Sequence, residues 1–438
     1  MTGTRLTSPH QQAVGAGRRG WPRGTRKFAR LARTAALDLA AIAGRMSTVR
    51  ESTDPDRTAR PAISLEATCF ARPPSGVARY VAALARHLPL ALPSHTIELH
   101  VARGTDLAAA ARAARELTGS RVALHHVPWQ DFAGHHNWPL AWARHSVLTV
   151  HDLINLDHPD YHPAWERWWY GRTLLAACRD ADRVIVPSRA TAEALVRWVD
   201  SELPHLRVVP HGVELDLAET VPAEDDLAAL GTLGVHGEFL LCVSTLYAHK
   251  GLTTLLDAYA MLRERRAGAL LATPTLVLAG EPLWEPTVRV IRARVHEPGL
   301  AGHVRVLGHV DDRTLVSLYR RARALVFPST AEGFGLPILE AMAIGTPVVC
   351  SDATALPEVA GGAALLFPSG DTEALVAAIT RILDSPWLAC ALVDRGRERA
   401  RALTWRACAA ATAAVYGELL ESGAGGGAVA ASGVAEVA

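Results

Sequence analysis

Lysine is almost absent from this chain of 438 residues. Only Lys27 and Lys250 occur among the 45 basic residues, and all the others are arginine. Because arginine serves nearly every basic position, a lysine within the folded part indicates a site that needs a compact point charge. The net charge is also low, at +1. This argues against nucleic-acid binding by the body of the protein.

Cysteine is scarce and lacks the spacing of metal or redox motifs. The six cysteines form no C-x-x-C pair, and Cys69, Cys242 and Cys350 lie in apolar runs. We therefore expect buried, reduced thiols in a cytoplasmic protein. The sequence also lacks a run of about 18 apolar residues, the length that indicates a membrane span.

Residues 1–60 form a basic extension with two alternative interpretations. Up to Arg50 it contains ten basic residues and one acidic residue. A loose apolar stripe from Phe28 to Met46, with arginines crowded at one end, is typical of a membrane-surface helix. That helix would bring the protein into peripheral contact with anionic lipid at the inner face of the membrane. The alternative is a disordered arm, or a start assigned upstream of Met46.

A predicted βαβ unit organises the rest of the chain. The apolar run Ala324–Phe327 suits a buried strand, and a glycine-rich loop over 328–335 follows it. Pro337 suits the start of a helix because its missing N–H is not needed there. Gly345 ends that helix, and Thr346–Cys350 reads as the next buried strand. Open α/β sheets bind ligands at the carboxyl ends of their strands, where this loop lies.

Two glutamates in this unit predict a sugar-nucleotide site. Glu332 lies in the loop, and Glu340 is expected in the first helical turn, where side chains tilt toward the helix N-terminus. The amides of Gly333, Phe334 and Gly335 point into the same volume, beside the positive end of the helix dipole. Carboxylates suit sugar hydroxyls, and free amides suit phosphate. The alternative is a surface loop whose glutamate caps a helix.

The run from Glu332 to Glu340, two glutamates with seven residues between them around Gly-Phe-Gly-Leu-Pro, resembles the signature of retaining GT-B glycosyltransferases of family 4 (glycosyl transferases group 1), with a mannosyltransferase-like appearance. The resemblance spans about residues 62–420 and is strongest over 239–368. It implies an α/β fold with two Rossmann-like doubly wound domains that face a cleft, and a C-terminal helix that crosses back to the first domain.

The acidic, turn-rich stretch from Glu219 to Asp226 is the best candidate for the boundary between these domains. The predicted parts are a basic N-terminal extension (1–60), an N-terminal Rossmann-like acceptor domain (61–218), a linker (219–236), a C-terminal Rossmann-like nucleotide-sugar-binding domain (237–400), a crossover helix (401–422) and a disordered tail (423–438).

The resemblance assigns roles to individual residues. It places Lys250 on the donor diphosphate, Glu332 on the sugar ring and Glu340 on the ribose. The expected catalytic residues are Glu332, Lys250 and His151; the expected donor-binding residues are Gly76, Thr245, Lys250, Gly333, Phe334, Gly335, Leu336 and Glu340. The chain departs from the family's pattern near Lys250. Thr245 and His249 occupy the two positions where many relatives have an arginine.

Metal ligands are not expected. His125-His126 and His135-His136 have no zinc-ligand spacing, so we expect a structural or acceptor-facing role for these histidines. Asp311 and Asp312 precede a predicted helix and read as an N-cap pair, not as the Asp-x-Asp metal motif of the other nucleotide-sugar transferase fold. The expectation is a metal-independent reaction without a cofactor.

The function implied by the resemblance is the transfer of a hexose, with mannose favoured, from a nucleotide diphosphate sugar such as GDP-mannose to a glycan or lipid-linked acceptor in polysaccharide or glycoconjugate biosynthesis. The leaving diphosphate would accept the acceptor's proton. Two alternatives stay open: a non-catalytic sugar-nucleotide-binding scaffold, or another GT-B reaction such as that of an epimerase or a phosphorylase. A phosphorylase would need a pyridoxal-phosphate lysine, and Lys250 is the only lysine in the predicted fold.

Overall fold

The computed structural model of the protein describes residues 61–67, 69, 75–100, 122–130, 143–158 and 164–422. The basic extension, the C-terminal tail and the pair His135-His136 lie outside the described residues, so the predictions made for them are not tested. Cys69, Cys242 and Cys350 are buried free thiols, as predicted.

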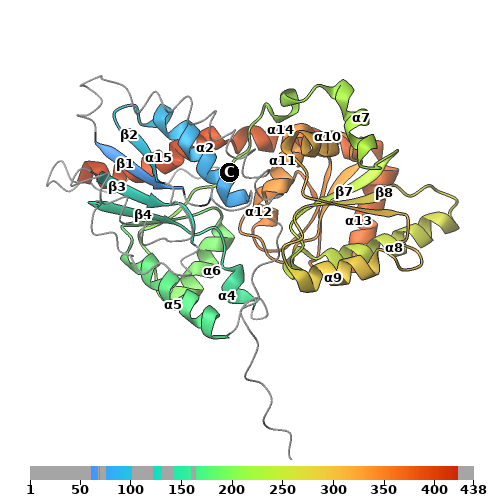
Figure 1. Ribbon diagram of the computed structural model, residues 1–438, viewed down its shortest axis with the longest axis horizontal. Helices are drawn as coiled ribbons and strands as arrows, with labels where there is room; N and C mark the ends of the chain where they lie inside the picture. The colour runs from blue at the N-terminus through green and yellow to red at the C-terminus, as the bar shows by residue number, and fades with distance from the viewer. Residues whose placement is uncertain are drawn as a thin grey trace, which may run out of the picture. The chain divides into compact units, whose positions relative to one another are not determined.

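The first sheet has six parallel strands in the order β2-β1-β3-β4-β5-β6 (Figure 1). Their bounds are β1 Ala62–Glu66, β2 Thr96–His100, β3 Val122–Val127, β4 His145–Thr149, β5 Arg183–Val186 and β6 Leu206–Val208. The central strands β1, β3, β4 and β5 are largely buried because helices cover both faces, as parallel sheets require, whereas the edge strand β6 is partly exposed. The order of the strands reverses at β1, where β2 lies on one side and β3 on the other.

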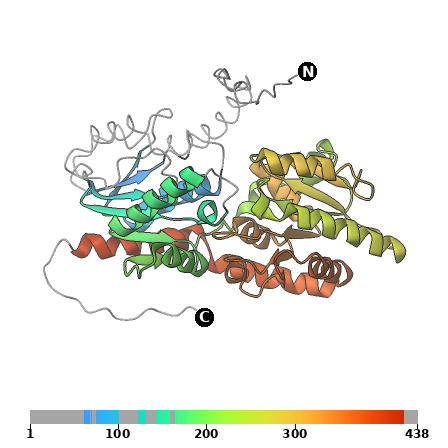
Figure 2. The same cartoon turned by 90° about the horizontal axis from the view of Figure 1, so that it is seen from below.

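Helices from both ends of the chain cover one face of this sheet. These are α2 (Gly76–Ala91) and the last helix, α15 (Trp405–Ser422), which Figures 1 and 2 both show in red beside the first-sheet elements. Tyr80 of α2 and Tyr416 of α15 are buried in the same core cluster as Ile63 of β1. The C-terminal helix therefore crosses back to the first sheet, as predicted. The other face is covered by α4 (Ile154–Asp157), α5 (Ala164–Asp180) and α6 (Arg189–Val199).

The second sheet also has six parallel strands, in the order β12-β11-β10-β7-β8-β9. Their bounds are β7 Phe239–Val243, β8 Thr275–Ala279, β9 Val304–Gly308, β10 Ala324–Phe327, β11 Val348–Ser351 and β12 Leu365–Phe367. One core cluster joins the sheet to α8 (Leu252–Gly268), α9 (Glu285–Arg294) and α13 (Thr372–Asp384). The opposite cluster joins it to α10 (Asp312–Arg321), α11 (Leu336–Ile344), α12 (Leu356–Ala360) and α14 (Pro386–Ala402). This is the doubly wound arrangement, and its direction reverses between β7 and β10.

The predicted βαβ unit is present as β10, α11 and β11. Pro337 lies at the start of α11, and Gly345 ends the helix in a left-handed conformation with φ 98°. Gly335, with φ 105°, precedes the helix, so α11 begins at Leu336, one residue before the predicted start. Glu340 consequently lies just past the first turn and not within it.

The chain passes between the sheets twice at one place. Val213 and Thr404 form a parallel bridge, in which Val213 N donates to Leu403 O at 3.0 Å. A Cβ on Gly212 would lie 2.1 Å from the carbonyl carbon of Thr404, so only glycine allows this approach. The predicted linker contains the short helices η7 (Ala223–Asp225) and α7 (Asp226–Thr232), and η6 (Leu217–Thr220) overlaps its start. The domain limits themselves stay a prediction.

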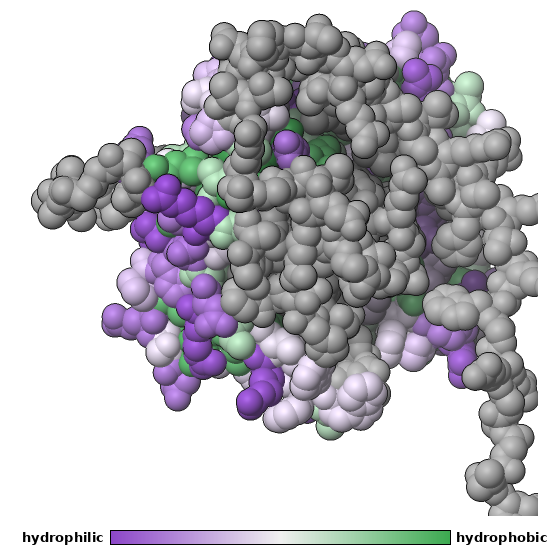
Figure 3. Space-filling view, turned by 60° about the vertical axis from the view of Figure 1, so that its left-hand side comes forward, coloured by the Kyte–Doolittle hydropathy of each residue, from purple (hydrophilic) through white to green (hydrophobic). Residues whose placement is uncertain are grey.

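Figure 3 shows one face of the molecule, on which hydrophilic and hydrophobic residues are interspersed wherever grey atoms do not cover them. Among the described helices, none alone has both the length and the apolar composition to cross a bilayer; α13 and α14 meet that test only together, across a bend of 98°.

Candidate functional site

The two charged residues of the predicted site meet at the reversal point of the second sheet. Lys250 ends the short helix η8 (Ala248–Lys250) after β7, and Glu332 lies in the loop after β10. The Lys250 Nζ lies 2.7 Å from Glu332 Oε1, and only 14% and 10% of the two side chains are exposed. Neighbouring strands β7 and β10 thus bring together residues 82 positions apart.

Close backbone approach makes this pair possible. Gly251 has φ 64°, and a Cβ there would lie 2.0 Å from Pro328 O. Thr330 N donates to His249 O at 2.7 Å, which ties the two loops together. Burial, with the nearby charge of Lys250, lowers the pKa of His249 to about 3. The imidazole is therefore neutral at pH 7. Position 249, where many relatives have an arginine, thus carries no charge in this chain.

Hydroxyl groups hold the backbone around Glu332. Glu332 N donates to Thr354 Oγ1 at 2.8 Å, and the same hydroxyl donates to Glu332 O at 2.8 Å. Gly333 O accepts from Ser188 Oγ at 2.8 Å and from Thr191 Oγ1 at 3.2 Å. A Cβ on Gly333 would lie 1.8 Å from His151 O, so this position also requires glycine.

The amides of the glycine-rich loop are available for a ligand. Among the described residues, the N–H groups of Gly333, Phe334 and Gly335 donate to no backbone carbonyl. They precede the N-terminus of α11, where the helix dipole favours an anion. These three N–H groups, which are predicted to bind phosphate, therefore have no backbone hydrogen-bond partner within the described residues.

Glu340 is buried and already has two partners. One Nη of Arg79, from α2, donates to Glu340 Oε1, and Tyr319 OH of α10 donates to Glu340 Oε2 at 2.9 Å. Burial, followed by the charge of Glu340, raises the pKa of Tyr319 well above its ordinary value, so the phenol stays a donor. The Glu340 carboxylate raises the pKa of Arg79 as well. A carboxylate has about four acceptor positions, so oxygen lone pairs are left for a ligand's hydroxyls.

The two aspartates at the start of α10 have different roles, which corrects the predicted N-cap pair. Asp311 Oδ1 accepts from Thr314 N at 2.7 Å and caps the helix. Asp312 instead accepts from the other Nη of Arg79 at 2.9 Å. A helix has only one N-cap position, and the next side chain is free to reach Arg79.

His151 faces inward, with both ring nitrogens in hydrogen bonds. Because Pro128 O can only accept, His151 Nε2 must donate to it, at 2.7 Å. His151 Nδ1 then accepts from His211 Nε2 at 3.0 Å. Burial lowers the pKa of His151 to about 4. Its imidazole is thus a neutral ring within the fold, and its catalytic role stays a prediction.

The remaining predicted residues lie around this centre. The position of a Cβ on Gly76 is 3.4 Å from Leu336 Cδ1, so the starts of α2 and α11 are in contact. Thr245 follows β7, and its carbonyl accepts from Tyr247 N at 3.0 Å. Asp152 Oδ1 accepts from Ile154 N at 3.1 Å and so orients the turn after His151.

The histidine pair in β3 has a structural role. His125 Nδ1 lies 2.7 Å from Ser64 Oγ. His126 lies 2.6 Å from Tyr416 OH and 2.8 Å from Thr149 Oγ1, which joins α15 to the first sheet. Both histidines are buried. Within the described residues, no group of three or more metal-ligating side chains lies together.

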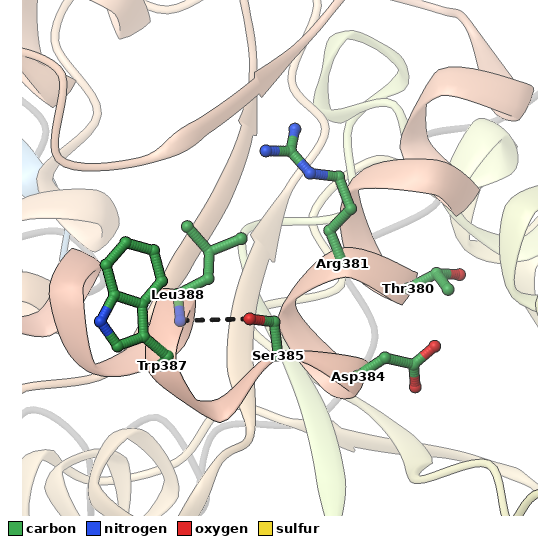
Figure 4. A pocket seen from close by; sticks show the side chains of 6 residues that line it. All are labelled: Thr380, Arg381, Asp384, Ser385, Trp387 and Leu388. Carbon is green, nitrogen blue, oxygen red and sulfur yellow. Dashed lines mark hydrogen bonds between the residues drawn. The ribbon is translucent and has the colours of Figure 1, made fainter.

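A pocket of about 440 Å³ lies elsewhere, at the corner between α13 and α14 (Figure 4). Its lining residues are Thr380, Arg381, Asp384, Ser385, Trp387 and Leu388. Ser385 Oγ accepts from Leu388 N at 3.3 Å and caps α14. None of these residues belongs to the predicted site.

Sequence reasoning missed Arg79, Tyr319 and Thr354. Each contacts a predicted glutamate from another element: Arg79 is 261 positions from its glutamate, Tyr319 is 21 and Thr354 is 22. The only local signal was the position of Arg79 in the first turn after Gly76. Nothing in the sequence near Thr354 marks it.

Comparisons with known proteins agree with this geometry. The family described as "Glycosyl transferases group 1" matches residues 233–401, and "Glycosyltransferase Family 4" matches residues 74–217. The chain is 33% identical over 274 residues to the O-antigen chain mannosyltransferase B of Escherichia coli, a match that covers 62% of this chain and 70% of the relative. It is 34% identical over 284 residues to the MMP α-(1→4)-mannosyltransferase of Mycolicibacterium hassiacum, covering 62% of this chain and 64% of the relative.

A solved structure supports the same fold. The sucrose-phosphate synthase of Thermosynechococcus elongatus superposes with a TM-score of 0.68 and 26% identity. The match covers 83% of this chain and all of that one.

Proposed function

Because the chain belongs to glycosyltransferase family 4 and has the GT-B fold, we propose that it transfers a hexose from a nucleotide diphosphate sugar with retention of the anomeric configuration. The proposed acceptor is a glycan or a lipid-linked glycan. Mannose is the favoured sugar, and GDP-mannose the favoured donor. The reaction needs neither a metal ion nor a cofactor.

The contact between Lys250 and Glu332 carries this proposal. A cation and a carboxylate lie 2.7 Å apart at the reversal point of a doubly wound sheet, beside three unused amides. A diphosphate needs the cation and the amides, whereas a sugar ring needs a hydrogen-bond acceptor. One sugar nucleotide would use all of these groups, which is why this arrangement supports a glycosyl donor.

In the proposed mechanism, Lys250 and the loop amides stabilise negative charge that grows on the diphosphate as the sugar–phosphate bond breaks. Glu332 turns from Lys250 to the hydroxyls of the sugar ring. Glu340, in contact with Arg79 and Tyr319, accepts from the ribose hydroxyls. The acceptor oxygen forms the new bond on the same face, and its proton passes to a leaving phosphate oxygen.

The choice of mannose rests on the relatives. Both curated proteins described above are named mannosyltransferases, at 33% and 34% identity. The second sheet, with the loop of Glu332, lies inside the region that matches glycosyl transferases group 1. These matches support the sugar more than the nucleotide or the acceptor.

The test is a donor panel with purified full-length protein. GDP-mannose, GDP-glucose, UDP-glucose and UDP-galactose are each screened by thermal shift, where a bound donor raises Tm by mass action. Donors that bind are then offered with mannosylated acceptors, and the anomeric configuration of the product is read by NMR. Release of GDP with an α-mannoside product is expected. An inverted product, or no transfer from any sugar nucleotide, contradicts the proposal.

A sugar-nucleotide-binding scaffold is the second candidate, because one observation favours it. His249 is neutral at a position where many family members carry arginine, so the diphosphate meets less positive charge. A scaffold would bind GDP-mannose in the thermal shift assay and release no nucleotide with any acceptor. Turnover would exclude it.

A further inference from the structure

Thr354 has a backbone conformation that a β-branched residue rarely adopts. Among the described residues, only Asp200, Leu270 and Thr354 combine a side chain with a positive φ. Asp200 ends α6, and Leu270 lies just past the end of α8, where left-handed residues are common. Thr354, with φ 45°, lies in the turn between β11 and α12. Its branched Cβ makes this conformation costly.

The hydroxyl of Thr354 reaches both backbone groups of one residue. It accepts from Glu332 N and donates to Glu332 O, each at 2.8 Å. The same turn supports the loop at a second point, because a Cβ on Gly335 would lie 2.8 Å from Leu356 Cδ2. The turn between β11 and α12 therefore lies directly against the loop that carries Glu332.

The Glu332 loop needs such support. Gly333 and Gly335 flank Phe334, and glycine loses more conformational freedom than any other residue when it is fixed. The loop cannot dispense with these glycines, since Gly333 packs against His151 O and Gly335 has φ 105°. Contacts from outside the loop supply this restriction: Ser188 and Thr191 hold Gly333 O, and Thr354 holds Glu332.

We infer that Thr354 is a positioning residue for Glu332: a strained turn holds the Glu332 backbone through one hydroxyl, so that the carboxylate stays at reacting distance. This inference rests on the proposed role of Glu332 in sugar transfer. Strained backbone at a site persists only when its surroundings maintain it. Glycine would adopt φ 45° without strain but has no hydroxyl. The threonine has a strained backbone and supplies the hydroxyl that contacts Glu332.

Three substitutions separate the hydroxyl from the strain. Thr354→Ser keeps the hydroxyl, Thr354→Val keeps the branched shape without it, and Thr354→Gly removes both the hydroxyl and the strain. We expect Thr354→Ser to stay within about threefold of the wild-type kcat. Thr354→Val and Thr354→Gly should lower kcat by about tenfold or more, because small errors in position cost large factors in rate. The KM for the donor should change by less than about twofold in all three.

Stability gives the second readout. Thr354→Gly should not lower Tm, since glycine tolerates a positive φ, although its activity falls. Leu270→Gly is the matched control for relief of strain, because Leu270 is 94% exposed at φ 58° and lies past the end of α8 opposite to Lys250. Thr232→Val is the control for loss of an exposed hydroxyl that bonds to a carbonyl. Both controls should keep the wild-type kcat.

Hydrogen exchange tests the contact without any turnover. Thr354→Val and Thr354→Gly should speed exchange in a peptide covering 329–336, and Thr354→Ser and the two controls should not. Faster exchange with unchanged kcat would overturn the positioning role while leaving the proposed function intact. Unchanged exchange and unchanged kcat would overturn the contact itself. A wild-type protein that transfers no sugar would contradict the proposed function instead, and the exchange result would still decide whether Thr354 holds the loop.

Discussion

The two sheets differ in the polar side chains that lie near their carboxyl edges. At the carboxyl edge of the second sheet, Lys250 pairs with Glu332, and Glu340 pairs with Arg79. Near the carboxyl edge of the first sheet lie the buried histidines His126 and His151, whereas its charged pairs, Arg183 and Arg207 with Glu418, link the strands β5 and β6 to α15. Burial lowers the pKa of His126 to about 3 and that of His151 to about 4, so both rings are neutral.

This difference separates the residues that we expect to act on a ligand from the residues that hold the fold together. Charged pairs can exchange their partners for those of a charged ligand. Neutral rings whose two nitrogens are both hydrogen-bonded have no free position to offer, as His126 and His151 illustrate. We therefore expect substitutions at the second edge to change kinetics and those around the histidines to change stability.

The largest expected effect is the loss of Lys250 or of the Glu332 charge. Lys250→Ala and Glu332→Gln should each lower kcat by about 10²-fold or more, since each removes a preorganised electrostatic contact to the transition state. Steady-state kinetics with varied donor and saturating acceptor measure this. Arg294→Ala, which breaks an exposed ion pair with Asp257 on α8, is the control and should leave kcat unchanged. If the two site variants turn over normally and only bind donor less tightly, the assigned roles are wrong.

The histidines should make stability fall in acid. An unfolded histidine titrates near pH 6.5, whereas His126 and His151 stay neutral in the folded state down to about 3 and about 4. Between these values the unfolded chain binds more protons, so the free energy of unfolding falls as the pH drops below about 6.5. By pH 5 each histidine should account for a loss of about 2 kcal/mol.

Urea denaturation at pH 7.5 and pH 5.0 measures this loss. His126→Gln should show a smaller difference between the two pH values than the wild-type protein. Equal unfolding free energies at both values in the wild type would show that the histidines titrate in the folded state.

A smaller effect is expected at the ribose position. Glu340 should contact the ribose equally in the ground and transition states, so Glu340→Gln should raise the donor KM by about tenfold with little change in kcat. Asp312→Asn is the matched control, because it removes the exposed carboxylate partner of Arg79 and spares Glu340. A fall confined to kcat would place Glu340 in the chemical step.

Removal of metal ions should have the smallest effect. EDTA should leave the turnover of the wild-type protein almost unchanged, since the proposed mechanism gives the diphosphate charge to Lys250 and the loop amides. Activity with and without EDTA, and with added Mn²⁺ or Mg²⁺, is the measurement. An absolute requirement for Mn²⁺ would contradict the mechanism.

The parts of the fold that depend on local sequence were predicted well. Proline and glycine mark the start and end of α11, and the neighbouring apolar runs are β10 and β11. The pairing of Lys250 with Glu332 was within reach too, since adjacent parallel strands bring their carboxyl ends together. The helix start was misplaced by one residue because Gly335 takes the left-handed conformation.

The residues that contact the two glutamates could not be predicted from the sequence, for a physical reason. Arg79 and Tyr319 meet Glu340 only through packing of α2 and α10 against α11, and no periodicity records such contacts. The role of Thr354 cannot be predicted from the sequence, because neither its φ nor the direction of its hydroxyl can be read from its neighbours. Asp312 was misread as a cap because its real partner, Arg79, is 233 positions away.

The return of α15 to the first sheet has a consequence for synthesis. The core that contains Ile63 and Tyr80 is completed by Trp405 and Tyr416, roughly 200 residues after β6 leaves the ribosome. At translation rates of about 5–20 residues per second, that face of the first sheet waits for about 10–40 s without its last helix. The second sheet, whose strands and helices are contiguous in the chain, completes its own core earlier. The half of the protein that is made first is thus the half that finishes last, and in the interval only α2, of the two helices that cover this face, is in place.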